Sequence, residues 1–328
     1  MKLKITLIAL LMNGMSYAQD GHLSMYDAAP MFLNGGLTGV FEGDYRFHAQ
    51  YRTQWKAVNY KPYTSALFSF DMPIRKWGIG VQINNFRAGA GNFNVLQGLI
   101  SAAYYVPLTK NKAHVLNFGL QGGVTQKSLE YQLLSFNNQY TLNNGGQFDQ
   151  TISSNESFGA ASKVIPMLNA SVLYYYSKSG SRFNPFIGAS LFNLLQPNES
   201  FFGHESKLPL RLYTHIGARI NITELLYLTP KVLVMNQKKF QEQTYAIEAG
   251  YFMKSSETYL LAGVIMRAKD AMITTIGVRK DSYIFKIGYD FNISSLTRTS
   301  SGRGGLELSF TYIFKKIKPT NFKNCPRL

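Results

Sequence analysis

The stretch Gly305 to Phe314 reads G-L-E-L-S-F-T-Y-I-F and decides the fold. Side chains of an extended strand alternate between its two faces with a period of two. One face of this strand carries Leu306, Leu308, Phe310, Tyr312 and Phe314. The other carries Glu307, Ser309 and Thr311, with Ile313 as the one apolar exception. An apolar face opposite a polar face over about ten residues is typical of a strand that separates lipid from the interior of a transmembrane β-barrel.

The same pattern recurs along the whole chain. In the stretch 44–55, one face carries Tyr45, Phe47, Ala49, Tyr51 and Trp55, and the other carries Arg46, His48, Gln50, Arg52 and Gln54. The weakest candidate is 258–267, which is apolar on both faces. We therefore predict an all-β fold, a transmembrane antiparallel β-barrel of the bacterial outer membrane with about 14 strands, an even number as single-chain barrels require. The predicted strands are 44–55, 63–72, 76–86, 96–107, 114–126, 165–177, 183–194, 210–222, 225–236, 243–253, 258–267, 271–279, 282–294 and 304–314.

The connections between these strands alternate in length, which predicts the orientation. The long ones, 55–62, 87–95, 127–164, 195–209 and 295–303, fall on one parity, although 237–242 and 268–270 are short. The other parity is mostly tight, as at 73–75, 177–182, 221–224, 254–257 and 280–281. Outer-membrane barrels have short periplasmic turns and longer extracellular loops. The segment 127–164, rich in Asn, Gln, Ser and Gly, is then a surface loop that caps the pore, contacts a partner or is mobile.

Residues 1–18 are predicted to be a signal peptide. Lys2 and Lys4 precede the apolar run 5–12, and Ser16-Tyr17-Ala18 is a small-x-small cleavage site. We expect 19–43 to be an N-terminal periplasmic segment, 44–314 the barrel and 315–328 a basic periplasmic tail. The high aromatic content, 21 Tyr and 23 Phe, suits the aromatic belts at the two membrane interfaces of a barrel.

The formal charge of +16 does not point to nucleic acid, because no basic cluster interleaved with aromatic residues lies on one predicted face. Attraction to acidic partners or to lipopolysaccharide phosphates fits an exported basic protein better. The five histidines show no metal-ligand spacing, and the chain has no G-x-S-x-G elbow and no P-loop. We expect a protein that is not an enzyme and needs no cofactor or metal. A hydrolase that assembles Ser and His across strands is the remaining catalytic alternative.

Two sets of residues are candidate sites. The first lies in the lumen and consists of Arg46, His48, Gln50, Arg52, Gln54 and Asp71. It either holds a plug, a translocating segment or an acidic terminus of a client, or it belongs to an internal ion-pair network. We favour the network, since charges removed from bulk water need compensating partners. Its expected acidic members are Asp71, Glu248, Asp290 and Glu307. The second set lies in the basic tail, which is either a frayed terminus or a periplasmic docking segment, and its candidate docking residues are Lys318, Cys325, Pro326 and Arg327.

Several motifs resemble the PorP/SprF family. They include Tyr51-Arg52-Thr53-Gln54-Trp55, Ser69-Phe70-Asp71-Met72-Pro73, Tyr174-Tyr175-Tyr176, Phe186-Ile187-Gly188, Gly288-Tyr289-Asp290 and the ending Cys325-Pro326-Arg327-Leu328. The chain departs from the family near its start, where Asn34-Gly35-Gly36 stands in place of Asn-Pro-Ala.

The resemblance implies an outer-membrane protein of type IX secretion and gliding motility. Such a protein assists export or surface anchoring of a specific large secreted protein. Its expected partners are outer-membrane lipid, that secreted protein, and periplasmic or lipoprotein components of the machinery. The alternative is an outer-membrane channel or hydrophobic-substrate transporter.

Overall fold

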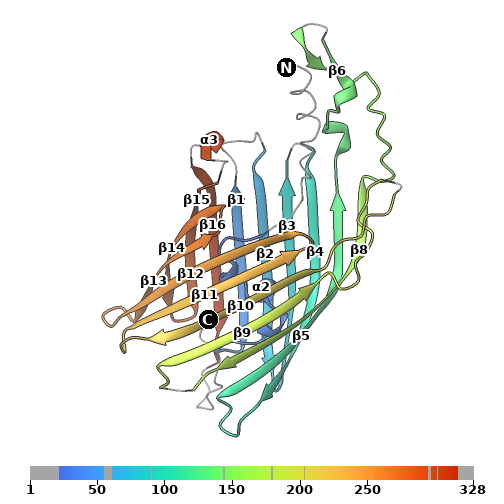
Figure 1. Ribbon diagram of the computed structural model, residues 1–328. Coiled ribbons are helices and arrows are strands. Elements are labelled where there is room, and N and C mark those ends of the chain that lie inside the picture. Colours follow the sequence, from blue (N-terminus) through green and yellow to red (C-terminus); the bar gives the residue numbers. More distant parts are fainter. Residues whose placement is uncertain are drawn as a thin grey trace, which may run out of the picture.

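The structure is a computed structural model that describes residues 22–54, 61–89, 91–142, 145–178, 180–202, 204–294, 297–300 and 302–316. Fourteen antiparallel strands close into one barrel (Figure 1). They are β1 (Tyr45–Gln54), β2 (Tyr63–Ile74), β3 (Trp77–Ala88), β4 (Phe93–Pro107), β5 (His114–Ser128), β8 (Ser162–Tyr176), β9 (Phe183–Phe192), β10 (Arg211–Asn221), β11 (Leu226–Gln237), β12 (Phe240–Met253), β13 (Thr258–Arg267), β14 (Ala271–Lys280), β15 (Tyr283–Asn292) and β16 (Arg303–Phe314).

The ring closes where β1 pairs with β16. Residues 45–54 pair with residues 314–305 without a break, so that Arg52 stands opposite Glu307 and Gln50 opposite Ser309. This confirms the predicted fold, the strand number and the closing role of the last strand. Each predicted range overlaps one observed strand. Trp55, the expected end of the first strand, lies outside the described residues.

The two faces of the strands are as the alternation predicts. On β1 the residues Arg46, His48, Gln50 and Arg52 are buried inside the barrel, while Phe47 and Tyr51 are exposed on the outside. On β16, Glu307, Ser309 and Thr311 point inward, and Leu306, Leu308 and Phe310 point outward. Aromatic rings gather near the rim where β1 begins, for example Tyr45 beside Phe314 and Trp77 beside Tyr104. An apolar outer wall with rings at its edge suits a lipid environment.

The connections divide between the two rims. At one rim the strands are joined by 55–62, 89–92, 129–161, 193–210, 238–239, 268–270 and 293–302, and at the other by 75–76, 108–113, 177–182, 222–225, 254–257 and 281–282. The longest loop contains two 3-10 turns, η3 (Tyr131–Leu133) and η4 (Asn137–Gln139), and a small hairpin of β6 (Tyr140–Thr141) and β7 (Gln147–Phe148). The four-residue helix α3 (Thr297–Ser300) lies in the last loop. The long loops are extracellular and the short turns periplasmic.

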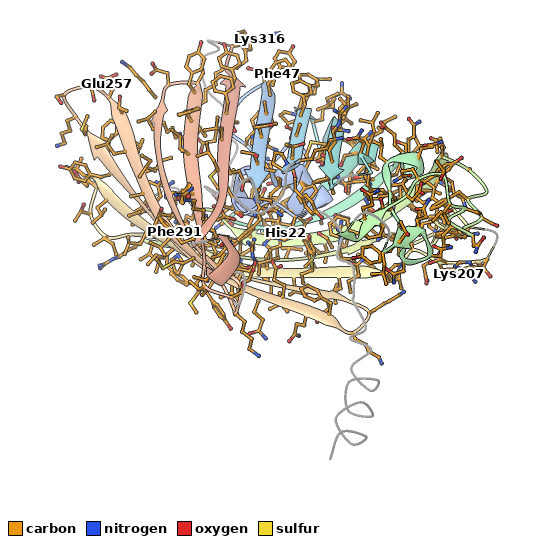
Figure 2. The ribbon with its side chains drawn as sticks, turned by 90° about the horizontal axis from the view of Figure 1, so that it is seen from above. His22, Phe47, Lys207, Glu257, Phe291 and Lys316 are labelled. Atoms are coloured by element: carbon orange, nitrogen blue, oxygen red, sulfur yellow. The ribbon has the colours of Figure 1, made fainter. Side chains whose placement is uncertain are left out.

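Residues 22–41 lie inside the barrel, and we call this segment the plug (Figure 2). It contains η1 (Tyr26–Ala28), α2 (Pro30–Leu33) and η2 (Gly35–Leu37). This differs from the expected periplasmic segment 19–43. The physical reason is the apolar content of the segment, since Met25, Met31 and Leu37 are almost fully buried and burial of such a side chain is worth about 1.5–3 kcal/mol.

The plug also explains why β13 is apolar on both faces. Leu261 and Ile265 point inward and are buried, and Ile265 belongs to the same apolar cluster as Tyr26 and Leu37 of the plug. A water-filled lumen would have required polar side chains at these positions. No helix among the described residues is long and apolar enough to cross a membrane.

Candidate functional site

The polar side of the plug is held near the junction of β1 and β16, where the barrel closes. The first group of contacts is made by Arg46 of β1 and Asp71 of β2. The Arg46 guanidinium donates to both carboxylate oxygens of Asp71, Nε to Oδ1 at 2.9 Å and Nη2 to Oδ2 at 2.7 Å. Nη2 also donates to the Leu37 carbonyl, and Asp71 accepts the backbone N–H of Gly39 at 2.7 Å. One ion pair of the wall therefore satisfies both a donor and an acceptor of the plug, as buried backbone groups require.

A second group of contacts fixes the beginning of the plug. Glu307 accepts the backbone N–H groups of Ser24 at 2.8 Å and Met25 at 3.2 Å. Gln50 donates to Glu307 and to the Met25 carbonyl. Arg52 donates to the His22 carbonyl at 2.8 Å. The two strands that close the barrel thus hold neighbouring residues of the plug, β1 through His22 and Met25 and β16 through Ser24 and Met25.

Asp290 on β15 extends this network. It accepts the Ser24 hydroxyl at 2.7 Å and pairs with Arg52 at 2.7 Å and with Arg267 at 3.5 Å. The side chains of Arg52 and Asp290 are 4% and 2% exposed, respectively, so the pairs are shielded from solvent. Loss of one partner of a buried pair costs about 3–5 kcal/mol, because it leaves an uncompensated charge.

The only charged side chain among plug residues 22–41, apart from the titratable His22, is Asp27, and it faces Lys231 of β11 and Lys286 of β15. Lys231 contacts Asp27 directly, Lys286 lies 4.0 Å away, and Glu248 pairs with Lys286. Burial alone would raise the pKa of Asp27, but the two ammonium groups lower it below its ordinary value. Asp27 therefore stays ionised and ties η1 to β11 and β15.

The apolar side of the plug packs against the wall formed by β5 and β8–β14. The shared cluster contains Tyr26, Leu33, Leu37 and Val40 from the plug with Val115, Leu173, Tyr175, Phe186, Phe192, Tyr213, Leu233, Met235, Ile265, Ala271 and Ile273 from the wall. A smaller cluster joins Leu23, Ala29 and Phe32 to Leu67 of β2. The plug thus fills the lumen, with its apolar side against this wall and its polar side toward the junction of β1 and β16.

The Asn34-Gly35-Gly36 turn is a point of close approach between plug and wall. Asn34 accepts the Gly36 N–H at 2.7 Å and donates to the Val172 carbonyl at 3.0 Å. A Cβ atom on Gly119 of β5 would lie 2.3 Å from the backbone of Gly35 and Gly36. The glycine in the wall is needed because the two backbones touch.

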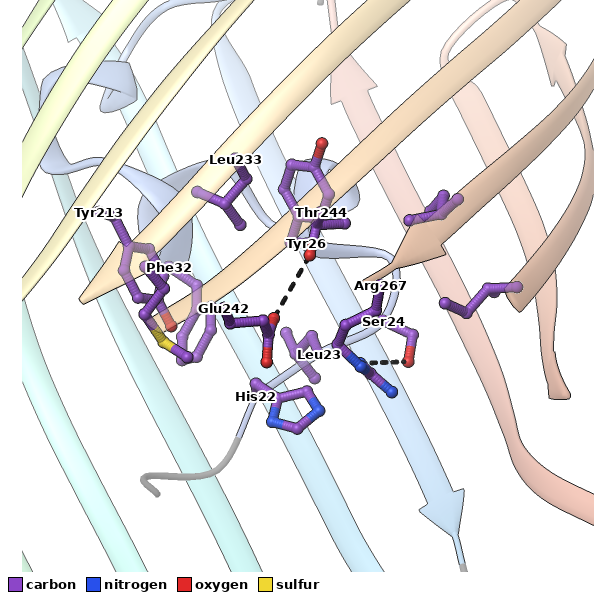
Figure 3. A pocket seen from close by; sticks show the side chains of 13 residues that line it. His22, Leu23, Ser24, Tyr26, Phe32, Tyr213, Leu233, Glu242, Thr244 and Arg267 are labelled. Carbon is purple, nitrogen blue, oxygen red and sulfur yellow. Dashed lines mark hydrogen bonds between the residues drawn. The ribbon is translucent and has the colours of Figure 1, made fainter. Parts of the chain in front are cut away.

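Above the plug lies a cavity of about 550 Å³, which we call the vestibule. It is bounded by the strand ends that carry the long loops, such as Gln54, Tyr63 and Phe93, so it belongs to the extracellular half of the barrel. His22 forms part of its floor, and Figure 3 shows His22, Ser24 and Arg267 together at a neighbouring small cavity, where Arg267 Nη1 donates to Ser24 Oγ at 3.5 Å. Burial and the guanidinium groups of Arg267 and Arg52 hold the pKa of His22 well below its ordinary value.

The extracellular loops pack on one another beside the vestibule. Tyr131 stacks on Phe158 with ring centroids 4.5 Å apart, and Phe158 contacts Phe202 at 4.8 Å. Lys127, at the base of the long loop, pairs with Glu199 of the 193–210 loop. The loop expected at 127–164 is therefore attached to its neighbour on one side of the rim.

The predicted lumen residues are brought together by the structure. Arg46, Gln50, Arg52 and Asp71 contact the plug directly, as described above. His48 lies between them and bonds to Thr311 at 2.8 Å and to Gln50 at 3.0 Å. Gln54 lines the vestibule instead. The expected acidic partners Glu248, Asp290 and Glu307 all take part in ion pairs.

A plug was one of the alternatives for these residues. The sequence did not show that this plug is the chain's own segment 22–41. The predicted tail residues Lys318, Cys325, Pro326 and Arg327 lie outside the described residues, as does the predicted signal peptide. Within the described ranges, no group of three or more His, Cys, Asp or Glu residues is placed to hold a metal ion.

A closed barrel of 14 strands with an apolar outer wall and a filled lumen defines this molecule as an integral β-barrel of the outer membrane. The chain matches the family model of the type IX secretion system membrane protein PorP/SprF over residues 15–312, and it belongs to that family. No curated protein matches the chain.

Three solved outer-membrane proteins are similar to this chain, and the first has a TM-score above 0.5. The CymD monoaromatic hydrocarbon channel is 12% identical, with a TM-score of 0.53, and the match covers 89% of this chain and 94% of that one. The toluene transporter TbuX of Ralstonia pickettii is 10% identical with a TM-score of 0.49, covering 88% of this chain and 94% of that one. The toluene transporter TodX of Pseudomonas putida is 10% identical with a TM-score of 0.48, covering 90% and 97%. At 12% identity the likeness to CymD extends to the fold alone.

Proposed function

We propose that this protein is a non-enzymatic outer-membrane component of type IX secretion and gliding, and that it assists export or surface anchoring of a specific large secreted protein. The observation that carries this proposal is the plug. Residues 22–41 cross the lumen and are bound to β1, β2, β11, β15 and β16, so they leave no room for a large polypeptide. The protein then acts beside the translocation path, as a surface platform that receives or holds the client.

The experiment is deletion of the gene followed by quantitative proteomics of the cell surface. The expected result is loss of one or a few large proteins from the surface while general secretion continues, with recovery on complementation. An unchanged surface proteome would contradict the proposal.

The basic tail is proposed to dock periplasmic or lipoprotein components. Truncation after Lys316 should keep a heat-modifiable barrel but lose co-purification of those components, and full function of the truncated chain would exclude this docking role.

The alternative is a transporter of apolar compounds, and a specific feature of the wall favours it. The β10–β11 ladder pairs Gly217 with Lys231 and Ile220 with Leu228, but not the residues between them. Pro230, which lies in this gap, has no N–H to donate. An apolar groove of about 530 Å³ opens there on the outer wall and reaches Phe186. Reduced uptake of an apolar solute by the deletion strain, with a normal surface proteome, would favour this alternative.

A further inference from the structure

The outer wall carries an apolar groove of about 530 Å³ where β9, β10 and β11 are neighbours in the barrel. Three of the side chains at its edges, Phe183, Ile187 and Ile216, are 53%, 45% and 51% exposed, respectively. Its volume lies in the range of ligand sites, about 300–1,000 Å³. Because the surrounding wall contacts lipid, the group that fills the groove in the membrane is apolar.

The groove is deep because the wall is interrupted beneath it. The β10–β11 ladder has a gap between Gly217 and Ile220 of β10. Phe186 and Lys231, which both point into the barrel, line the groove at this place. The Lys231 ammonium group contacts Asp27 of the plug, so this residue offers its aliphatic stem to the groove.

The groove ends at the plug. On the inner side of Phe186 and Lys231 lies a cavity of about 10 Å³, whose lining includes Tyr26 and Leu37 of the plug. A cavity of this size holds a single water molecule. An apolar molecule in the groove therefore stays in the wall and does not reach the lumen, which favours a resident chain over a transported solute.

The groove lies in the periplasmic half of the wall. Phe183 directly follows the periplasmic turn 177–182, and Tyr174 lies two residues before the end of β8 at the same turn. From Phe183 the groove follows β9 to Ile187, which is about 13 Å of extended strand. One leaflet is half of the roughly 30 Å hydrocarbon core, so the groove fits a chain of the periplasmic leaflet.

The periplasmic turn at the groove, 177–182, and its neighbour 108–113 are cationic. They contain no Asp or Glu, and their charged residues are all exposed: Lys110, Lys112, Lys178 and Arg182. The two turns are in contact, because the Ser177 N–H donates to the Ala113 carbonyl at 2.8 Å. Among the residues that the structure describes, none of these four side chains forms an ion pair.

These turns suit the phosphate of a lipid. Lys and Arg side chains at a membrane surface attract anionic headgroups, and phosphate oxygens accept charge-assisted hydrogen bonds from them. The turns lie at the rim of the barrel, which is the level of the headgroups, and the groove begins directly beside turn 177–182. The cationic turn and the apolar groove therefore match the two ends of one molecule.

We propose that the groove is a binding site for an anionic phospholipid of the periplasmic leaflet. One acyl chain lies in the groove, and the phosphate lies at the turn that carries Lys178 and Arg182. The bound chain packs against Phe186 and Lys231, which contact the plug from their other side. This site goes beyond the proposed secretion role and does not depend on it.

The test is native mass spectrometry of the full mature chain in a nonionic detergent with added lipid. The probes are dioleoyl phosphatidylglycerol, dioleoyl phosphatidylcholine, which has the same chains but no net charge, and glycerol phosphate, which has no acyl chain. The barrel should retain one phosphatidylglycerol molecule with an affinity at least fivefold higher than for phosphatidylcholine, since each cation near the headgroup favours the anionic lipid. An excess of glycerol phosphate should not displace it.

Two charge variants test the headgroup site. The double variant Lys178→Gln with Arg182→Gln should bind phosphatidylglycerol no better than phosphatidylcholine. The matched control is Arg75→Gln with Lys76→Gln, which removes the same two charges from the exposed β2–β3 turn, away from the groove. This control should keep the preference.

Two further variants test the acyl-chain site. Ala218 lies in the groove and is 8% exposed, so Ala218→Phe fills the groove and should abolish retention of both lipids. Ala262→Phe, on the exposed outer face of β13 in the same half of the wall, is the control and should bind as the unchanged protein does. Heat-modifiable migration shows that each variant keeps its barrel.

Four results would overturn the proposal. Equal retention of the two lipids by the unchanged protein would make the groove a site for any apolar chain, as the transporter alternative requires. Displacement by glycerol phosphate would leave a phosphate site without an acyl chain. Unchanged retention by Ala218→Phe would place the lipid elsewhere on the wall. A dimer that Ala218→Phe disrupts would assign the groove to a second copy of the chain.

Discussion

Glu307, on the last strand of the barrel, accepts the backbone N–H of Ser24 at 2.8 Å, although the two residues are 283 positions apart in the chain. This contact joins the first described turn of the chain to the strand that closes the ring. Glu307 is fully buried, so its carboxylate has no access to water as a substitute partner.

Replacement of Glu307 by alanine should lower the free energy of unfolding by about 3–5 kcal/mol, because it leaves two backbone N–H groups and part of the Arg52 charge uncompensated. Urea unfolding of the purified barrel in detergent measures this. Glu224→Ala, at an exposed periplasmic turn, is the control and should have little effect. Equal stabilities of the two variants would mean that Glu307 does not hold the plug.

The plug should keep the barrel closed to ions. In planar bilayers the unchanged protein should not conduct, whereas a chain without residues 22–41 should form a stable pore. A second variant, Asp27→Ala with Glu307→Ala, removes the contacts of the plug with Lys231, Lys286 and Glu307 without shortening the chain and should show transient openings. A steady conductance of the unchanged protein would contradict a plugged lumen.

Acid should loosen the start of the plug. The pKa of His22 is lowered in the docked state, so released His22 takes up a proton at a higher pH than docked His22 does. Docking is therefore at full strength above the ordinary pKa of about 6.5 and weakens as the pH falls below it. Hydrogen exchange of residues 22–33, corrected for the intrinsic rate, should be faster at pH 5.5 than at pH 7.5.

Two comparisons test this assignment. The variant His22→Gln should lose the difference between pH 7.5 and pH 5.5. Asp27 has a lowered pKa, so its contribution is present above its ordinary value of about 3.9 and is lost only as the pH falls below that. A pH effect that His22→Gln retains would exclude His22 as its source.

An arginine on the lipid face should impair assembly. Ile276, in the middle of β14, is 65% exposed on the outer wall. The substitution Ile276→Arg should cost about 2–4 kcal/mol at the bilayer midplane, while Ile276→Leu should be nearly neutral. The yield of heat-modifiable barrel in the outer membrane measures both, and equal yields would mean that this face does not contact lipid.

Labelling of intact cells tests the orientation. Leu142, beside the β6–β7 hairpin, is 83% exposed. With Cys325 replaced by serine, a cysteine at Leu142 should react with a membrane-impermeant maleimide on intact cells, whereas a cysteine at Glu224 should react only after the outer membrane is opened. The opposite pattern would reverse the orientation.

The strands could be predicted because each has a period of two that no other element imitates over ten residues. Pairs such as Phe310 outside and Ser309 inside place lipid and lumen on known sides. The charged lumen residues were recognisable for the same reason, since Arg46 and Arg52 fall on the polar face of β1. Their ion-pair partners followed from the need to compensate buried charge.

The plug could not be predicted from periodicity, because its 3-10 turns and its four-residue helix are too short to show one. Two signals were present. The segment 22–41 is strongly apolar and has Asp27 as its one acidic residue and no Lys or Arg, which is unusual for a chain in water. The apolar inner face of β13, with Leu261 and Ile265, requires an apolar partner inside the barrel.

The course of the plug restricts how the molecule can be assembled. The chain runs from His22 at the vestibule to Asp44 at the opposite rim, and only then begins the ring that surrounds it. Once β1 and β16 are paired, the sheet has no edge through which residues 22–41 could enter from the side. The plug can therefore reach its place in two ways only, along the barrel axis after the ring has closed, or by the strands folding around it before β1 pairs with β16.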